Sequence, residues 1–446
     1  MMRTWELGGW ALGDFLTTLF ERRRASEVAA SGKPLPDLCR ALLSGQGEVS
    51  GMKRAAEVLM RYRQAEQAEK AAFFRFLADE MDLDPGAVAE AAQAYGADPN
   101  TAHLAALLAV AEPPRQELLR RLNQAPSGTA DLVAMRVDLM AAAKEAPDLA
   151  RVDLDFQHLF ASWFNRGFLV LRRIGWESPA NILEKIIAYE AVHEIHSWDD
   201  LRRRLEPADR RCFAFFHPAM PDDPLIFVEV ALTHGIPGAV GPLLAKDRTA
   251  LAPQDMDTAV FYSISNCQAG LRGISFGNSL IKQVVDVLGR EVPGLKTFVT
   301  LSPIPGFVRW LEGQDDPQAK ALLAADPATV DPEMLRAQVA RYLLEGKARN
   351  GQPLDPVARF HLGNGAEVHR VHAAADLSPK GRAQSRGGMV NYLYDPARVE
   401  QNHEAFASHQ TIAASRGVKA LVKAVAGAKA VAGAAKDRKE KGRNDQ

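Results

Sequence analysis

Residues 258–307 constrain the fold of this chain more than any other stretch. An apolar run at 259–265 is followed by a turn that carries Gly270, Gly273 and Gly277, and then by apolar residues at helical spacing. A second short apolar run, 298–301, ends at the sequence SPIPG, residues 302–306. The order strand, glycine loop, helix, strand places backbone N–H groups at a helix N-terminus, where they can bind an anion such as a phosphate.

Composition limits the remaining possibilities. A chain of 446 residues is too long for one ordinary core, so we expect at least two domains. A formal net charge of −1 gives no general signal for nucleic-acid binding. Three scattered cysteines (Cys39, Cys212 and Cys267) favour free thiols in a reducing compartment over disulfides or a zinc site. The N-terminus lacks a signal-peptide pattern and no apolar run reaches membrane-spanning length, so we expect a soluble cytoplasmic protein with no membrane partner.

The first part of the chain, residues 1–157, has a helical pattern. Apolar residues recur at three- and four-residue steps, and Asp84-Pro85 is the typical N-cap and first position of a helix. No catalytic group of residues stands out there. We expect a helical scaffold or oligomerisation domain.

Residues 158–415 are expected to form a mixed α/β domain, which makes the fold class α+β. The turn at 221–224 is predicted to join the second and third strands, and a turn at 363–365 the last two. The seven runs read as strands are 168–174, 212–218, 225–233, 259–265, 298–301, 358–362 and 367–373. The remaining residues, 416–446, are rich in alanine and lysine and are predicted to be a frayed helix and a flexible tail.

The glycine loop has the sequence RGISFG over residues 272–277, which fits R-x-x-G-x-G with Ser275 in place of the middle glycine. In the acetyltransferase-like fold that binds acyl-coenzyme A, such a loop holds the pyrophosphate with its N–H groups. Small residues let the backbone approach the phosphate, and the helix dipole favours its charge. A tight strand-to-helix turn explains the glycines equally well.

Two residues are candidates for chemistry. Ser302 follows an apolar strand at the SPIPG turn, and its simpler interpretation is a hydroxyl that stabilises the turn. His361, in the sequence FHLGNG, is a natural acid–base group near neutral pH, but it could also be a half-buried strand histidine. Tyr392 and Tyr394 share one face of any strand there, a spacing that is typical of core residues.

The other histidines give no metal site. His193 and His196 do not have the H-E-x-x-H spacing of a zinc helix. His369 and His372 are three residues apart, so on a strand they would point to opposite faces.

Taken together, several ordered segments resemble the malonyl-CoA decarboxylase family. In chain order they are FFHPAMPDDPLIFVEVALT, FYSISNCQAGLRGISFGNSLIKQVV, TLSPIPGFVRWL, FHLGNGAEVHRVH and MVNYLYD. The resemblance covers most of the second half of the chain and is more specific than any single glycine loop.

The resemblance implies a helical N-terminal domain followed by an acetyltransferase-like (GNAT-type) domain that converts malonyl-CoA to acetyl-CoA and CO2. By this resemblance Ser302 and His361 are the catalytic pair. The residues that it implies for substrate binding are Ser263, Arg272, Gly273, Ile274, Ser275, Phe276, Gly277, Asn278, Asn364 and Tyr394. Some family members carry a glutamate where this chain has Ser275, so the role of that carboxylate does not transfer.

Loss of CO2 from malonyl-CoA leaves an enolate that the thioester itself stabilises, so we expect no cofactor and no metal. The resemblance also implies a homo-oligomer, with a tetramer as the first expectation. Two alternatives stay open at this point. One is an acyltransferase that passes an acyl group from coenzyme A to an acceptor, and the other is a non-catalytic acyl-CoA-binding protein.

Overall fold

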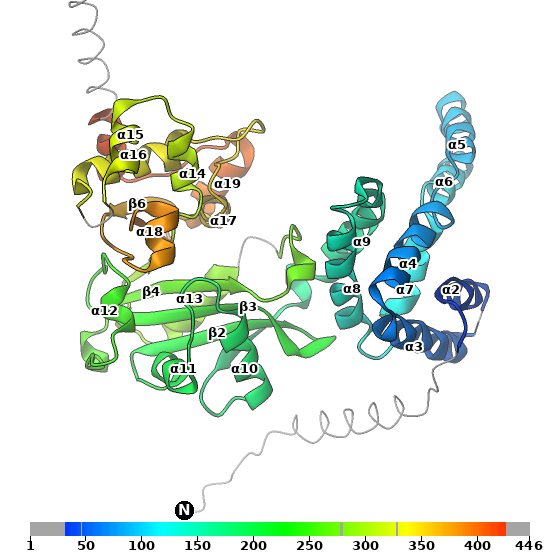
Figure 1. The fold of residues 1–446 in the computed structure, drawn as a ribbon, viewed down its shortest axis with the longest axis horizontal. Coiled ribbons are helices and arrows are strands. Elements are labelled where there is room, and N and C mark those ends of the chain that lie inside the picture. Colours follow the sequence, from blue (N-terminus) through cyan, green and yellow to red (C-terminus); the bar gives the residue numbers. More distant parts are fainter. Residues whose placement is uncertain (1–31, 46, 277–279, 327–328, 425–446) are drawn as a thin grey trace, which may run out of the picture. The chain divides into compact units, whose positions relative to one another are not determined.

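A computed structural model describes residues 32–45, 47–276, 280–326 and 329–424 (Figure 1). The chain divides into two compact units. The first contains the described residues up to Phe168, together with His217–Pro221 and Gln268–Phe276. The second contains Leu169–Phe216, Asp222–Cys267 and the described residues after the glycine loop.

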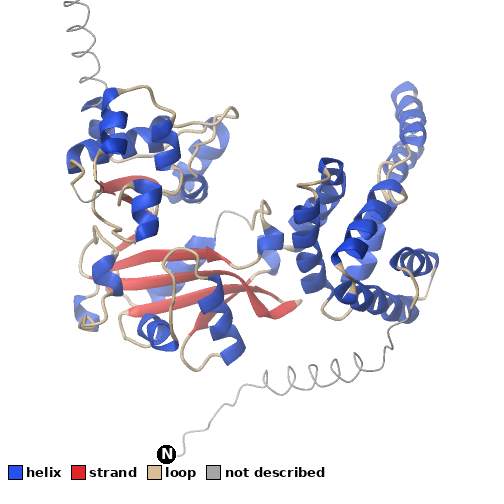
Figure 2. Ribbon diagram, in the orientation of Figure 1, coloured by secondary structure: helices blue, strands red, loops and turns tan. Residues whose placement is uncertain are grey.

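The described N-terminal region of the first unit is built from helices alone, as its sequence pattern predicts (Figure 2). Asp84 caps a helix by accepting hydrogen bonds from the N–H groups of Gly86 and Ala87, and Pro85 is the first helical residue, as predicted. The helices are α2 (Leu35–Ser44), α3 (Glu48–Gln64), α4 (Gln67–Asp79), α5 (Pro85–Ala97), α6 (Thr101–Val110), α7 (Pro114–Asn123), α8 (Gly128–Ala142) and α9 (Ala150–Trp163).

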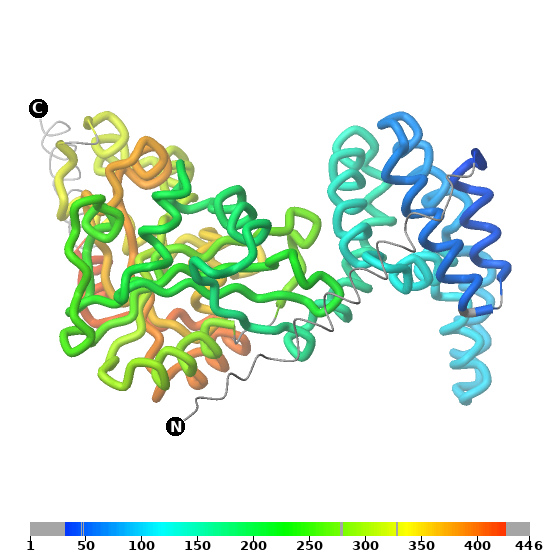
Figure 3. Tube along the Cα trace, turned by 90° about the horizontal axis from the view of Figure 1, so that it is seen from below, coloured from blue at the N-terminus to red at the C-terminus, as the bar shows by residue number. Residues whose placement is uncertain are grey.

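Helices α5 and α6 form a hairpin that projects beyond the other helices of the unit (Figures 1 and 3). They pack against each other, yet neither contains a buried residue. Leu108 is 62% exposed and Leu104 is 38% exposed. This hairpin therefore presents apolar side chains that the described part of its own chain does not cover.

The second unit is organised around a seven-stranded sheet in the order β1-β2-β3-β4-β5-β7-β6 (Figure 2). Strands β4 and β5 are parallel, and the neighbouring pairs β1–β2, β3–β4, β5–β7 and β6–β7 are antiparallel. The strands are β1 (Val170–Ile174), β2 (Arg210–His217), β3 (Met220–Thr233), β4 (Thr258–Asn266), β5 (Thr297–Thr300), β6 (Glu367–His372) and β7 (Met389–Leu393). The mixed α/β character that the sequence predicts is confirmed.

Two predictions in this unit are wrong. Residues 358–362 are not a strand but lie in helix α17 (Pro356–Gly363), and β7 is the seventh strand instead. The turn between β2 and β3 falls at Pro218-Ala219, so the predicted turn at 221–224 lies inside β3. Strand β4 ends at Asn266, opposite Ile226, so this first part of β3 has no β4 partner and tolerates its prolines.

Helices cover the sheet. Alternate residues of β2 (Cys212, Ala214 and Phe216) point to one face, where they pack with Ile182 and Ile186 of α10 (Ala180–Tyr189) and with Leu201 of α11 (Trp198–Leu205). The remaining helices are α12 (Gly241–Leu244), α13 (Leu280–Glu291), α14 (Phe307–Glu312), α15 (Pro317–Ala324), α16 (Pro332–Glu345), α18 (Pro379–Ser385) and α19 (Val399–His409).

The sheet opens between its two parallel strands. Strand β4 pairs with β3 along its whole length, but it pairs with β5 only from Thr258 to Phe261. Tyr262 is an extra residue in the ladder between β3 and β4, because Val230 faces Phe261 and Glu229 faces Ser263. Beyond this bulge the ends of β4 and β5 separate. The expected strand–loop–helix–strand order is present as β4, the glycine loop, α13 and β5.

Residues 416–424 are helical, and the rest of the predicted tail lies outside the described residues. Among the described helices, none combines the length and apolar character needed to cross a lipid bilayer.

Candidate active site

Ser302 lies just beyond the end of β5, where the sheet continues as a single bridge to β7. Its N–H donates to the carbonyl of Val390 over 2.8 Å, and its carbonyl accepts from the Val390 N–H over 3.0 Å. The side chain is 5% exposed. Both backbone groups of Ser302 are therefore held, and its hydroxyl is left for side-chain contacts.

His361 reaches Ser302 from helix α17. Asp355 begins this helix, since its carboxylate accepts from the N–H groups of Val357 and Ala358 at 3.0 Å each, and Pro356 is the first helical residue. The same carboxylate accepts from the N–H of Gly306 in the SPIPG turn. Asp355 thus connects the helix that carries His361 to the turn that follows Ser302.

The end of α17 accounts for the rest of the FHLGNGA motif. The Gly365 N–H donates to the carbonyl of Leu362, and the Ala366 N–H donates to that of His361, which is a Schellman cap. Gly365 has φ +82°, and a Cβ there would lie 2.1 Å from the carbonyl oxygen of Val399. Asn364 Nδ2 donates to the carbonyl of Phe360, while its Oδ1 has no partner among the described residues.

Three side chains meet at the site. The Ser302 Oγ lies 3.1 Å from His361 Nε2, and the Tyr394 hydroxyl lies 2.8 Å from His361 Nδ1. Ser302 Oγ also donates to Thr300 Oγ1 over 2.8 Å, and Thr300 Oγ1 accepts from the Tyr392 N–H. The result is a continuous hydrogen-bonded chain from Thr300 to Tyr394 through the imidazole.

Burial determines the protonation states of the side chains in this hydrogen-bonded chain. His361 is 2% exposed, and desolvation lowers its pKa to about 3, so the imidazole is neutral at pH 7. The ring of Tyr392 stacks on it at 4.5 Å between centroids. Burial also raises the pKa of Tyr394 well above its ordinary value. A neutral imidazole between two hydroxyls can accept a proton at one nitrogen and release another from its second nitrogen.

Ser263 makes a different set of contacts. Its hydroxyl donates to the carboxylate of Glu190, with oxygen–oxygen distances of 2.8 and 2.7 Å. Glu190 follows α10 and also accepts from the N–H groups of Val192 and His193. The structure therefore places Ser263 on β4 beside Glu190, and none of its described hydrogen bonds reaches Ser302.

The glycine loop groups with the helical unit up to Phe276. Arg272, Gly273 and Ser275 are exposed, Ile274 is buried and Phe276 is half-buried. Gly273 has φ +82°, a left-handed conformation that favours glycine. Gly277 and Asn278, which complete the predicted loop, lie outside the described residues.

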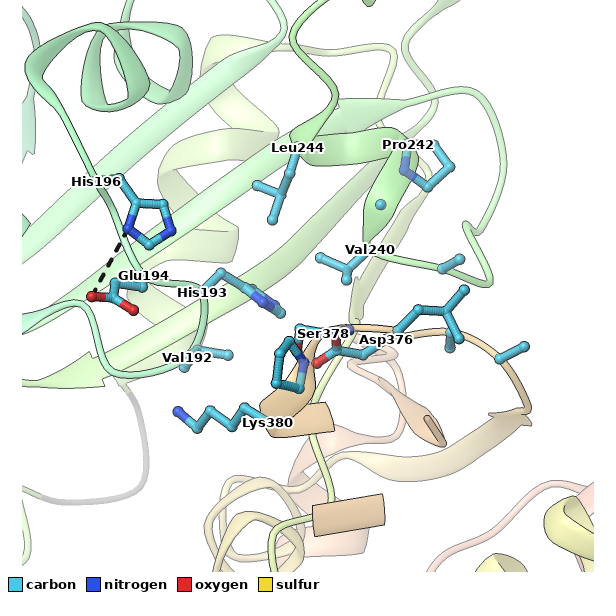
Figure 4. A pocket seen from close by; sticks show the side chains of 16 residues that line it. Val192, His193, Glu194, His196, Val240, Pro242, Leu244, Asp376, Ser378 and Lys380 are labelled. Carbon is cyan, nitrogen blue, oxygen red and sulfur yellow. Dashed lines mark hydrogen bonds and ion pairs between the residues drawn. The ribbon is translucent and has the colours of Figure 1, made fainter. Parts of the chain in front are cut away.

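A cavity of about 730 Å³ opens in the second unit (Figure 4). Val192, His193, Val240, Asp376 and Lys380 line it, with mostly apolar neighbours. His193 Nε2 has no hydrogen-bond partner among the described residues, and desolvation lowers the pKa of this histidine to about 4.

A smaller cavity of about 140 Å³ shares three of these lining residues: Val192, Asp376 and Lys380. Its other lining residues include Pro303 and Pro305, the neighbours of Ser302 in the SPIPG turn. The two cavities therefore adjoin each other beside the Ser302 turn.

Neither metal binding nor thiol chemistry is indicated elsewhere. Among the described residues there is no group of three or more His, Cys, Asp or Glu side chains that could hold a metal ion. The three cysteines are free and buried, as expected for structural thiols, and desolvation raises the pKa of Cys39 to about 12.

The structure thus brings together Ser302, His361 and Tyr394 of the predicted site residues. It also shows contacts that the sequence did not reveal. Thr300 and Glu190 carry no motif signal of their own. Asp355 carries such a signal, because Asp355-Pro356 has the same helix-cap pattern as Asp84-Pro85.

Comparisons with known proteins show what this chain is similar to. A family model described as malonyl-CoA decarboxylase C-terminal domain matches residues 167–432, and one described as malonyl-CoA decarboxylase N-terminal domain matches residues 82–164. The chain is 33% identical over 466 aligned residues to the mitochondrial malonyl-CoA decarboxylase of Anser anser anser, covering 93% of this chain and 92% of the relative.

Two solved structures are also similar. The crystal structure of malonyl-CoA decarboxylase from Rhodopseudomonas palustris has 51% identity and a TM-score of 0.82, over 87% of this chain and 99% of that one. The structure of malonyl-CoA decarboxylase from Cupriavidus metallidurans has 36% identity and a TM-score of 0.70, over 87% of this chain and 98% of that one.

Proposed function

Since the chain belongs to the malonyl-CoA decarboxylase family, we propose that it converts malonyl-CoA to acetyl-CoA and CO2. The observation that carries this proposal is the buried hydrogen-bonded chain of Ser302, His361 and Tyr394 at the end of β5. It supplies a positioned proton donor in a buried site.

The reaction makes three demands on the protein. The bond between the carboxylate carbon and Cα breaks, its electron pair enters the thioester as an enolate, and CO2 leaves. A proton then forms a new bond to Cα. The protein must hold the carboxylate out of the thioester plane, stabilise the enolate oxygen and deliver that proton.

Ser302 is the group proposed to face the substrate, and His361 stands behind it. In this proposal the Ser302 hydroxyl gives its proton to Cα of the enolate. Because the imidazole is neutral, Nε2 then returns a proton to Ser302 Oγ as Nδ1 receives one from the Tyr394 hydroxyl. The proton that the reaction consumes then comes from solvent through this chain. The Ser302 hydroxyl donates to Thr300 Oγ1 in this structure, so it must turn from Thr300 toward the substrate to give up its proton.

Substrate binding is proposed for the remaining predicted residues. The loop Arg272–Asn278 would hold the pyrophosphate of coenzyme A through its N–H groups. Asn364 Oδ1, a buried acceptor without a described partner, suits an amide N–H of the pantetheine arm. Ser263 would support the site from β4, where Glu190 holds its hydroxyl.

An assay without any acceptor tests the function. Purified protein is incubated with malonyl-CoA, and CO2 and acetyl-CoA are measured over time. Equal amounts of the two products without an added acceptor support the decarboxylase. Tight binding of malonyl-CoA without turnover would instead support a non-catalytic acyl-CoA-binding protein.

Acyl transfer is a second candidate, and the 730 Å³ cavity favours it. An acceptor molecule needs a space beside the acyl group, and the two adjoining cavities reach the SPIPG turn next to Ser302. If this candidate is correct, loss of malonyl-CoA or acetyl-CoA depends on an added amine or thiol acceptor.

We also propose that the protein is a cytoplasmic homo-oligomer, with a tetramer as the first expectation. The α5–α6 hairpin supports this, because it exposes alanine and leucine side chains and buries none of its residues in its own chain. A second copy of the chain is the occupant proposed for this surface.

A further inference from the structure

Arg136 of α8 is a buried guanidinium in the helical unit, only 2% exposed. Its Nε and Nη2 donate to the two carboxylate oxygens of Asp153 on α9, over 2.7 and 3.3 Å. This bidentate pair fixes the plane of the guanidinium and leaves Nη1 pointing elsewhere.

The remaining nitrogen of Arg136 binds the glycine loop. Nη1 donates to the carbonyl of Gly270 over 2.7 Å and to the carbonyl of Arg272 over 2.9 Å. The two partners lie 134 and 136 residues further along the chain. A side chain of the helical region thus holds two carbonyls of the loop that is proposed to bind phosphate.

Gly270 shows how closely this loop approaches α8. A Cβ at Gly270 would lie 1.9 Å from the carbonyl oxygen of Val133, so only glycine fits. Val133 stands three residues before Arg136, and both therefore lie on one face of the helix. That face makes two contacts with the loop, one by close packing and one by hydrogen bonds.

These contacts determine where the N–H groups of the loop point. In a trans peptide the C=O and N–H bonds are antiparallel. Since the Arg272 carbonyl points to Arg136, the N–H of Gly273 in the same peptide points away from α8. Gly273 has φ +82°, and no described residue accepts a hydrogen bond from its N–H.

We propose that Arg136 is a positioning residue for the coenzyme A site. By holding the carbonyls of Gly270 and Arg272, it orients the Gly273 N–H and its neighbours toward the pyrophosphate of the substrate. Arg136 is buried and its nitrogens bind Asp153 and the two carbonyls, so it acts through the loop and does not touch the ligand. This inference rests on the proposed coenzyme A-binding role of the loop.

The test is the affinity for coenzyme A, measured by calorimetry on the full chain. Arg136→Met should raise the Kd by about tenfold, the scale of a lost charge-assisted hydrogen bond. Gly270→Ala, made separately, should also raise the Kd, because its Cβ would push the loop away from the Val133 carbonyl. Arg136→Lys keeps a charge but cannot replace the bidentate contact, so it should recover only part of the affinity.

Arg115→Met is the matched control. Arg115 is a second buried arginine of the helical unit, 3% exposed, and it binds Asp82, Asp155 and backbone carbonyls without contacting the loop. The Arg115→Met variant should lose stability as Arg136→Met does, because each variant leaves a carboxylate without its arginine partner. Its Kd for coenzyme A should equal that of the unmodified protein.

Kinetics separate positioning from general damage. With malonyl-CoA, Arg136→Met should raise KM about tenfold and change kcat little. With malonyl-pantetheine, which lacks the nucleotide and its phosphates, KM should not change. Unaltered coenzyme A affinity in both Arg136→Met and Gly270→Ala would overturn the proposal, and so would equal losses on both substrates. If the unmodified protein releases no CO2 at all, the proposed function fails, while the coenzyme A affinities still decide the role of Arg136.

Discussion

At the scale of single residues, the buried imidazole of His361 connects two hydroxyls. Its two nitrogens face Ser302 and Tyr394, and the ring is covered by Tyr392. Each of these contacts limits the orientation of the ring. Because burial keeps the ring neutral, a proton can leave Nε2 only as another arrives at Nδ1. Proton transfer therefore depends on the partner at Nδ1 as much as on the partner at Nε2.

Tyr394→Phe isolates that second partner. The change removes only the hydroxyl that lies 2.8 Å from His361 Nδ1 and keeps the aromatic packing against Phe261. We expect kcat to fall by about tenfold to a hundredfold, within the range of positioned proton-transfer groups, with KM nearly unchanged. Steady-state rates of acetyl-CoA formation measure this. An unchanged kcat would remove Tyr394 from the proton path.

The buried imidazole also makes stability depend on pH. The pKa of His361 is about 3 in the folded protein and about 6.5 in the unfolded chain. Between these values the unfolded chain binds more protons, so the stability from His361 is complete above pH 6.5 and is lost as the pH falls toward 3.

Lowering the pH from 7 to 5 should therefore reduce the free energy of unfolding by about 2 kcal/mol more in the unmodified protein than in His361→Gln. Urea unfolding of both proteins at pH 7 and pH 5 measures the two losses. The other titrating groups are the same in both proteins, so their effect cancels when the losses are subtracted. Parallel losses in the two proteins would show that His361 is not buried in its neutral form.

At the scale of elements, Asp355 joins the two segments that carry Ser302 and His361, the proposed catalytic pair. It caps α17 and accepts from Gly306 of the SPIPG turn and from the Tyr342 hydroxyl. Four donors therefore depend on one carboxylate that is 1% exposed.

Asp355→Ala should lower stability by about 2 kcal/mol, from the lost cap and the unsatisfied donors. It should also lower kcat by about tenfold, because His361 moves with its helix. Asp331→Ala is the control. Asp331 also caps a helix, α16, but it is exposed and makes none of the contacts of Asp355, so kcat should not change. Equal kcat values for both variants would contradict the role of Asp355.

Most elements could be predicted from the sequence, because apolar periodicity and caps determine them locally. The helices 101–110 and 280–291 and the strands of the β4–β5 unit follow their patterns closely. Helix α17 was missed because it has only eight residues, and its alternating Ala358, Phe360 and Leu362 resemble a strand. The cap signal Asp355-Pro356 was the evidence for the helix.

The site was less predictable from local pattern, because its members come from distant segments. Ser302 and His361 are 59 residues apart, and only the family resemblance paired them. Nothing in the sequence near Glu190 or Arg136 points to Ser263 or Gly270, since those contacts exist only after folding. Such buried polar pairs follow from tertiary packing and not from periodicity.

At the scale of the whole molecule, the helical unit has two roles in this account. It holds the glycine loop through Arg136, and it exposes the α5–α6 hairpin, the surface proposed for assembly.

Leu108→Asp tests the assembly role. Leu108 is 62% exposed, so the change should leave the fold of one chain intact and place a charge in the proposed interface. We expect light scattering to show a smaller oligomer than that of the unmodified protein. Val49→Asp, at a residue that is 68% exposed on α3, is the control and should not change the mass. The same mass in all three proteins would exclude the hairpin from the interface.

The rate of CO2 release from malonyl-CoA, compared among the unmodified protein, Ser302→Ala and His361→Ala, tests the central claim most directly. The two side chains share one hydrogen bond in one buried site, so each variant should lose about a hundredfold or more in kcat. Binding of coenzyme A should persist in both variants. Near-normal CO2 release from both Ser302→Ala and His361→Ala would contradict the assignment of the site.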